Sequence, residues 1–179
     1  MGEKTQAEGK RKRENMVKDT LFFRTDDPCS ELEKISIAKE CFENPVFYSY
    51  NKLPIAFDIY LHGICGIFAL ALNAEFGYKT YIAAEECYDD VPLLDRLVHV
   101  YCACNDVVID VRGMTEDKDR FFDEFSDFLT GDSDYFEVEP NELKQIISKE
   151  MSETEFGMFY KAAQQFISNH YQDFCLLNK

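Results

Sequence analysis

The feature that most constrains the fold is a pair of short apolar runs, residues 96–104 and 107–112, which are separated only by Asn105 and Asp106. Both runs are rich in residues that favour strands. Both turn residues tolerate the left-handed backbone region that a tight hairpin requires. The pattern therefore predicts an antiparallel hairpin with a two-residue turn, in which Cys104 faces Val107.

The length of this turn decides which side chains share a face, because side chains alternate along a strand. We expect one apolar face that holds Val98, Val100, Cys102, Cys104, Val107, Ile109 and Val111. The other face holds His99, Tyr101, Ala103, Val108, Asp110 and Arg112. Tyr101 then faces Asp110 and His99 faces Arg112, so His99 and Asp110 become diagonal neighbours within side-chain reach. A three-residue turn would place them on opposite faces.

A strongly apolar segment precedes the hairpin. Residues 64–76 are apolar on nearly all sides and are followed by Gly77, a favourable residue at a helix end. We expect a buried central helix with Cys65 in its first turn. A short strand is expected at residues 79–84, followed by an acidic loop at residues 85–90.

Further elements flank this region, each marked by capping or breaking residues. In chain order they are a helix from Ser30 to before Pro45, extended or irregular chain over residues 46–60, a helix capped by Thr115 that ends at Gly131, a strand at residues 135–138, and two helices, one after Pro140 and one capped by Ser152. This order predicts an α+β domain, with the central helix bearing Cys65 packed on a small antiparallel sheet and with N- and C-terminal helices beside it.

Size and charge narrow the function further. The 179 residues suit a basic flexible tail at residues 1–20, whose Lys10 to Arg13 run could also serve as a localisation signal, and a single domain at residues 21–179. The net charge of −15 argues against nucleic acid and fits a basic substrate or protein partner better. There is neither a membrane-length apolar run nor a signal-peptide core, and the seven cysteines are an odd number. We therefore expect a cytoplasmic protein with reduced thiols and no membrane contact.

Three residues then suggest chemistry. A thiol at a helix N-terminus, a histidine on a strand and a carboxylate on the next strand are the parts of a cysteine nucleophile site. We expect Cys65 to be the nucleophile, His99 the general base and then acid, and Asp110 the residue that orients His99. The helix start and protonated His99 would favour the thiolate of Cys65. No cofactor or metal is needed for this chemistry.

An oxyanion would bind at the same helix start. Backbone N–H groups there are suitable donors, and Gly66 would leave room for the substrate. A second donor is not identified by the sequence, and the candidates are His62, Tyr60 and Asn51.

With these residues the chain resembles the papain-like superfamily in its broad sense, which includes transglutaminases and arylamine N-acetyltransferases. The matching segments are residues 63–66, 97–101 and 108–113, so the resemblance covers about residues 57 to 113. It implies a cysteine protease, hydrolase, deamidase or acyltransferase that acts on a protein, peptide or small amide through a thioester. The chain departs from the family in having no Trp, hence no Cys-Trp pair, and no Gln a few residues before Cys65.

Three other interpretations remain open. Cys65 could be one more buried thiol, with Asp110 serving as a partner for Arg112. A zinc site could use His62, Cys65, His99, Cys102 and Cys104, although the hairpin register turns Cys102 away from His99. Finally, the chain could be a non-enzymatic acidic module that binds or inhibits a basic protein.

Overall fold

The computed structural model describes residues 49–50, 53–54, 59–86 and 91–176. The basic tail and the helix expected after Ser30 lie outside the described residues. The described part is an α+β fold, as the order of elements in the sequence predicts.

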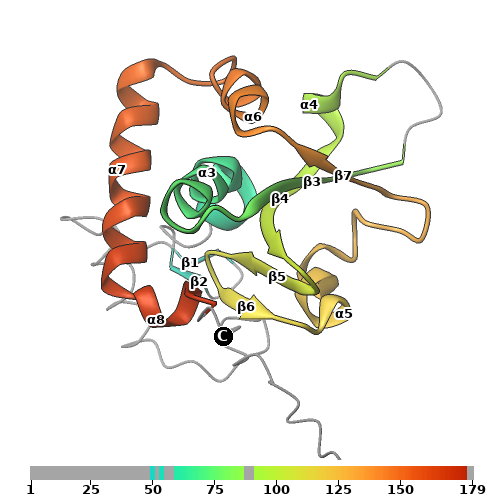
Figure 1. The fold of residues 1–179 in the computed structure, drawn as a ribbon. Coiled ribbons are helices and arrows are strands. Elements are labelled where there is room, and N and C mark those ends of the chain that lie inside the picture. Colours follow the sequence, from blue (N-terminus) through green and yellow to red (C-terminus); the bar gives the residue numbers. More distant parts are fainter. Residues whose placement is uncertain (1–48, 51–52, 55–58, 87–90, 177–179) are drawn as a thin grey trace, which may run out of the picture.

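The centre of the fold is a five-stranded antiparallel sheet with the strand order β6-β5-β4-β3-β7. Its strands are β3 (Lys79–Ala84), β4 (Leu97–Cys104), β5 (Val107–Asp110), β6 (Gly113–Thr115) and β7 (Asp134–Val138). A separate pair, β1 (Ser49–Tyr50) and β2 (Leu53–Pro54), is also antiparallel. The long strand β4 therefore lies in the middle of the sheet, between β3 and β5 (Figure 1).

The predicted hairpin register is confirmed over its first three pairs. Cys104 pairs with Val107, and the ladder continues to Cys102 opposite Ile109. Asn105 has a φ of 55°, the left-handed conformation expected of a turn residue. The alternation of side chains that follows from this register is therefore present in the fold.

Beyond Ile109 the prediction is wrong, because the strand reverses instead of following β4. A turn at Val111 and Arg112 leads into β6, and Asp110 pairs with Gly113 rather than Tyr101. Gly113 has a φ of 116°, which a residue with a side chain rarely adopts. His99 and Arg112 consequently do not face each other across a ladder.

Helix α3 (Cys65–Phe76) is the buried centre of the helical layer. It ends at Gly77, whose φ of 72° closes the helix in the left-handed conformation. The helix packs on β4 and contacts α6 (Pro140–Ile147) and α7 (Glu153–Asn169), with α7 on its far side from the sheet (Figure 1). Ser152 and Glu155 form the predicted capping box of α7.

The helix expected from Thr115 to Gly131 is wrong in both its start and its length. Thr115 belongs to β6, and Asp117 caps a short helix, α5 (Lys118–Phe122), by accepting a hydrogen bond from the N–H of Arg120. A single 3-10 turn, η2 (Asp123–Phe125), follows. The phenylalanines at helical spacing cover the sheet face opposite α3, where Phe121 packs on Tyr101 and Val108.

Three short elements were not expected from the sequence. They are one π-helical turn, η1 (Ile59–Gly63), and two short helices, α4 (Leu93–Arg96) and α8 (Tyr171–Phe174). None of the helices that the structure describes is long and apolar enough to cross a bilayer.

Candidate active site

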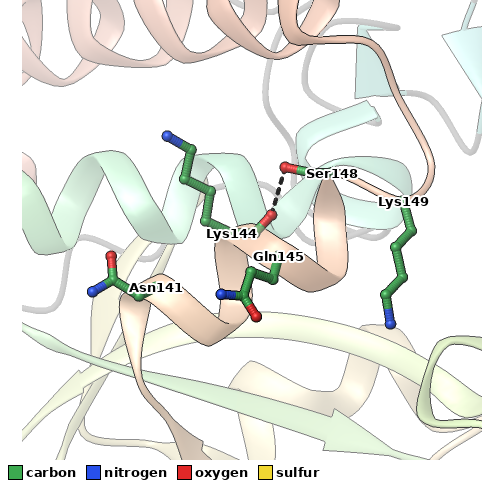
Figure 2. A pocket seen from close by; sticks show the side chains of 5 residues that line it. All are labelled: Asn141, Lys144, Gln145, Ser148 and Lys149. Atoms are coloured by element: carbon green, nitrogen blue, oxygen red, sulfur yellow. Dashed lines mark hydrogen bonds between the residues drawn. The ribbon is translucent and has the colours of Figure 1, made fainter.

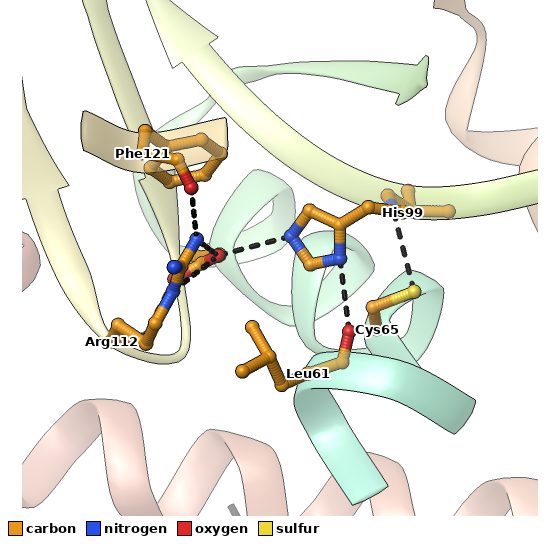
Figure 3. A network of polar contacts seen from close by, with 7 residues as sticks. Leu61, Cys65, His99, Arg112 and Phe121 are labelled. Atoms are coloured by element: carbon orange, nitrogen blue, oxygen red, sulfur yellow. Dashed lines mark hydrogen bonds and ion pairs between the residues drawn. The ribbon is translucent and has the colours of Figure 1, made fainter. Parts of the chain in front are cut away.

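His99 and Asp110 meet as the hairpin register predicts. His99 lies on β4 with 0% of its surface exposed, and its Nε2 is 3.0 Å from Oδ2 of Asp110. Its Nδ1 is 3.0 Å from the carbonyl oxygen of Leu61 in η1. The imidazole is therefore held between a carboxylate and a backbone carbonyl (Figure 3).

Both partners of the imidazole are acceptors. A carbonyl and an ionised carboxylate have no proton to give, so each hydrogen bond needs a proton on the ring nitrogen. Burial alone would raise the pKa of Asp110, but the charge of Arg112 and the hydrogen bond and charge of His99 outweigh it and hold the pKa well below its usual range. With Asp110 ionised, this geometry suits an imidazolium that donates from both nitrogens.

Arg112 completes a buried ionic network. Its Nη2 donates to Oδ2 of Asp110 at 2.7 Å and to the carbonyl of Phe121 at 2.9 Å, and its Nε also donates to the carboxylate. Arg112 and Asp110 are 0% and 3% exposed. The sequence placed Arg112 on the face of His99 but did not indicate that its side chain would turn back onto Asp110.

Aromatic rings close the network from the side away from α3. The ring of Phe125 stacks on the imidazole of His99 with centroids 4.3 Å apart, and the guanidinium of Arg112 lies 4.7 Å from the ring centroid of Phe121. Such faces attract cations. Helical spacing predicted these phenylalanines as core residues, but gave no sign that they would contact His99 and Arg112.

Cys65 is the first residue of α3 and lies next to β4. Its Sγ accepts a hydrogen bond from the backbone N–H of Val100, the residue after His99, at 3.3 Å (Figure 3). The thiol side chain is buried, with the residue 4% exposed. Burial raises its pKa to about 11, which outweighs the stabilisation of the thiolate by the N–H groups of Val100 and Gly66. The expected thiolate-favouring environment is therefore wrong for this arrangement.

A cavity of about 230 Å³ opens beside Cys65. It is lined by the start of α3, the α4–β4 segment and the end of α6, which contribute Gly63, Ile64, Cys65, Gly66, Leu94, Asp95, Leu97, Val100, Ile146, Ile147, Glu150 and Met151. His99 and Asp110 are not part of this lining. A larger open hollow of about 490 Å³ lies along the outer side of α6 and contains no nucleophilic thiol (Figure 2).

Two of the four oxyanion candidates have other roles in the structure. The hydroxyl of Tyr60 donates to the carbonyl of Phe159 at 2.6 Å. Gly66 is a packing position, because a Cβ there would lie 2.6 Å from Cδ1 of Ile147. Asn51 and the side chain of His62 lie outside what the structure describes.

The zinc alternative has no geometric basis among the described residues. No group of three or more His, Cys, Asp or Glu side chains is placed to hold a metal ion there. Cys102 points to the α3 side of the sheet, where its thiol donates to the carbonyl of Ala69.

Comparisons of the chain with models of protein families, with curated proteins and with solved structures found no match.

Proposed function

We propose that the protein is a cysteine-nucleophile enzyme that transfers acyl groups through a thioester on Cys65, with His99 and Asp110 as its acid–base pair. The observation that carries this proposal is the pairing of His99 Nε2 with Asp110, on the strand segment whose backbone holds the Cys65 thiol. This order of groups matches the papain-like resemblance, in which the second imidazole nitrogen serves the thiol.

The arrangement described above is a resting one. Nδ1 of His99, the nitrogen that would serve Cys65, is bound to the carbonyl of Leu61. Activation requires this carbonyl to leave Nδ1 and the site to lose one proton to solvent, which converts a thiol and an imidazolium into a thiolate–imidazolium pair. π-Helical turns such as η1 occur often at functional sites.

The reaction then follows from the groups present. The thiolate attacks the substrate carbonyl, and Nδ1–H of His99 protonates the leaving amine or alkoxide as the thioester forms. His99 next takes a proton from water or an amine, which attacks the thioester and restores the thiol. The first N–H groups of α3 have no side-chain cap from Ile64 and are suited to bind the oxyanion.

The substrates in this proposal are proteins, peptides or small amides in the cytoplasm, and nucleic acid has no part in it. The net charge of −15 supports basic substrates over phosphate-rich ones.

An activated acyl ester tests the proposal. The protein is incubated with a p-nitrophenyl ester, and intact-mass and peptide mapping locate the acyl group. We expect acylation of Cys65, its loss in Cys65→Ala, and at least a hundredfold slower acylation in His99→Gln. Cys104→Ala is the matched control, because Cys104 is a half-buried thiol outside the cavity.

The competing role is structural, and one observation favours it: His99, Asp110 and Arg112 are buried and bind one another. In that case Cys65→Ala and the wild type would acylate alike, while His99→Gln would lose stability. Acylation that persists without the Cys65 thiol therefore overturns the enzymatic proposal.

A further inference from the structure

The cavity beside Cys65 has an apolar body and an acidic rim. Its apolar walls come mainly from Leu97, Val100 and Ile147, while Asp95 and Glu150 supply its only charged side chains within the described lining. Asp95 is on α4 and Glu150 follows α6, so the two carboxylates approach the opening from different elements.

No basic side chain of the described residues neutralises this rim. Neither Asp95 nor Glu150 forms an ion pair with another described residue. Arg96 is adjacent in sequence, but its Nη1 donates to Asp134 and to the carbonyl of Glu85. Lys149, next to Glu150, lines the outer hollow of α6 instead (Figure 2).

We propose that this cavity binds a group with an aliphatic body and a cationic end, such as a lysine side chain or an alkyl ammonium, and places it beside the Cys65 sulfur. The apolar walls suit the methylene chain and the two carboxylates suit the charge, as long cationic side chains bury their stems and keep their charged ends near water. A volume of about 230 Å³ is below the usual range of about 300–1,000 Å³ for drug-sized ligands, which favours a single side chain.

This inference names the substrate class of the proposed enzyme and rests on that function. Its test is independent of turnover. Methanethiosulfonate reagents transfer a thioalkyl group to a thiolate: the sulfur of Cys65 forms a disulfide and methanesulfinate leaves. The 2-aminoethyl reagent is cationic and the 2-sulfonatoethyl reagent is anionic, so their rate ratio at Cys65 measures the charge preference of the cavity.

We expect the cationic reagent to label Cys65 faster than the anionic one at low salt. In Asp95→Asn/Glu150→Gln the ratio of the two rates should fall about tenfold, because two charges within several ångströms of the reagent are removed. The matched control is Glu116→Gln/Asp132→Asn, which removes the same charge from two exposed residues outside the cavity and should keep the ratio within about twofold. Peptide mapping isolates the Cys65 signal from the other cysteines.

An equal fall in both double variants would overturn the inference, since the preference would then come from the overall charge. Failure of the cationic reagent to label Cys65 would overturn it as well, because the cavity would not admit a cation. If the ratio behaves as expected but acyl esters do not react with Cys65, the binding preference holds and the enzymatic proposal fails. If acylation occurs without the charge preference, the proposed function holds and this inference fails.

Discussion

The protonation of Cys65 gives the sharpest prediction. Burial raises the pKa of the thiol from its ordinary 9.0 to about 11, a difference of two pH units. At pH 7.5 the thiolate fraction is then about 0.03%, roughly a hundredfold below that of an ordinary thiol. Because the thiolate is the nucleophile, Cys65 in this arrangement should be alkylated at least a hundredfold more slowly than in the unfolded chain.

This outcome reverses the expectation that Cys65 would be the fastest thiol in an enzyme of this kind. Cys104 and Cys175 are half-buried, and we expect both to react with iodoacetamide before Cys65 at pH 7.5. The rate at Cys65 should rise tenfold per pH unit from pH 7 to about pH 10, without a plateau.

The assay is a pH series of iodoacetamide alkylation, read by peptide mapping, with the protein in 8 M urea as the reference for unperturbed thiols. Circular dichroism at each pH keeps loss of structure separate from ionisation. A plateau below pH 8 would refute the reasoning, because it would mean that the folded protein already holds the thiolate and that burial does not control this thiol.

Three further predictions concern the groups around Cys65. Arg112→Met should lower the free energy of unfolding by about 3–5 kcal/mol in urea titrations, because it leaves Asp110 buried without its main cation, whereas the same change at the partly exposed Arg120 should cost under about 1 kcal/mol; a similar cost at both sites would contradict this. The pKa of Asp110 is lower in the folded than in the unfolded state, so its contribution to stability is present above about pH 4 and is lost below it; relative to Asp110→Asn, the wild type should lose up to about 1.4 kcal/mol per pH unit between pH 4 and pH 2, and parallel stability curves would disprove this assignment. Tyr60→Phe should cost about 1 kcal/mol through the lost hydrogen bond to Phe159 yet leave acylation of Cys65 unchanged, and slower acylation would reinstate the Tyr60 hydroxyl as an oxyanion donor.

The sequence predicted those parts of the fold that depend on local patterns. Strict alternation of apolar side chains set the β4–β5 register, and this register alone brought His99 to Asp110. Capping residues likewise predicted α7 and the end of α3. Such signals are readable because each residue's preference agrees with its place in the fold.

Other features could not be predicted because they depend on tertiary packing or on backbone atoms. The face of His99 was expected to be polar, but it also carries Tyr101 and Val108, and a second aromatic layer buries it completely. Periodicity alone cannot show that this layer folds back over the sheet. The carbonyl that binds His99 belongs to Leu61, and a backbone carbonyl has no residue signature in a sequence.

The position of that carbonyl explains how one site can combine a buried charge network with a reactive thiol. The imidazole of His99 is rigid on its Asp110 side, where strand pairing and Arg112 hold the carboxylate. On its Nδ1 side it depends on a single bond to η1, which is followed at once by the exposed Gly63 on the rim of the cavity. A substrate entering this cavity touches η1 before it reaches His99, so binding and release of Nδ1 are physically linked. The network thus keeps His99 and Asp110 aligned while Cys65 stays protonated, and only the movement of one carbonyl separates this state from a nucleophilic one.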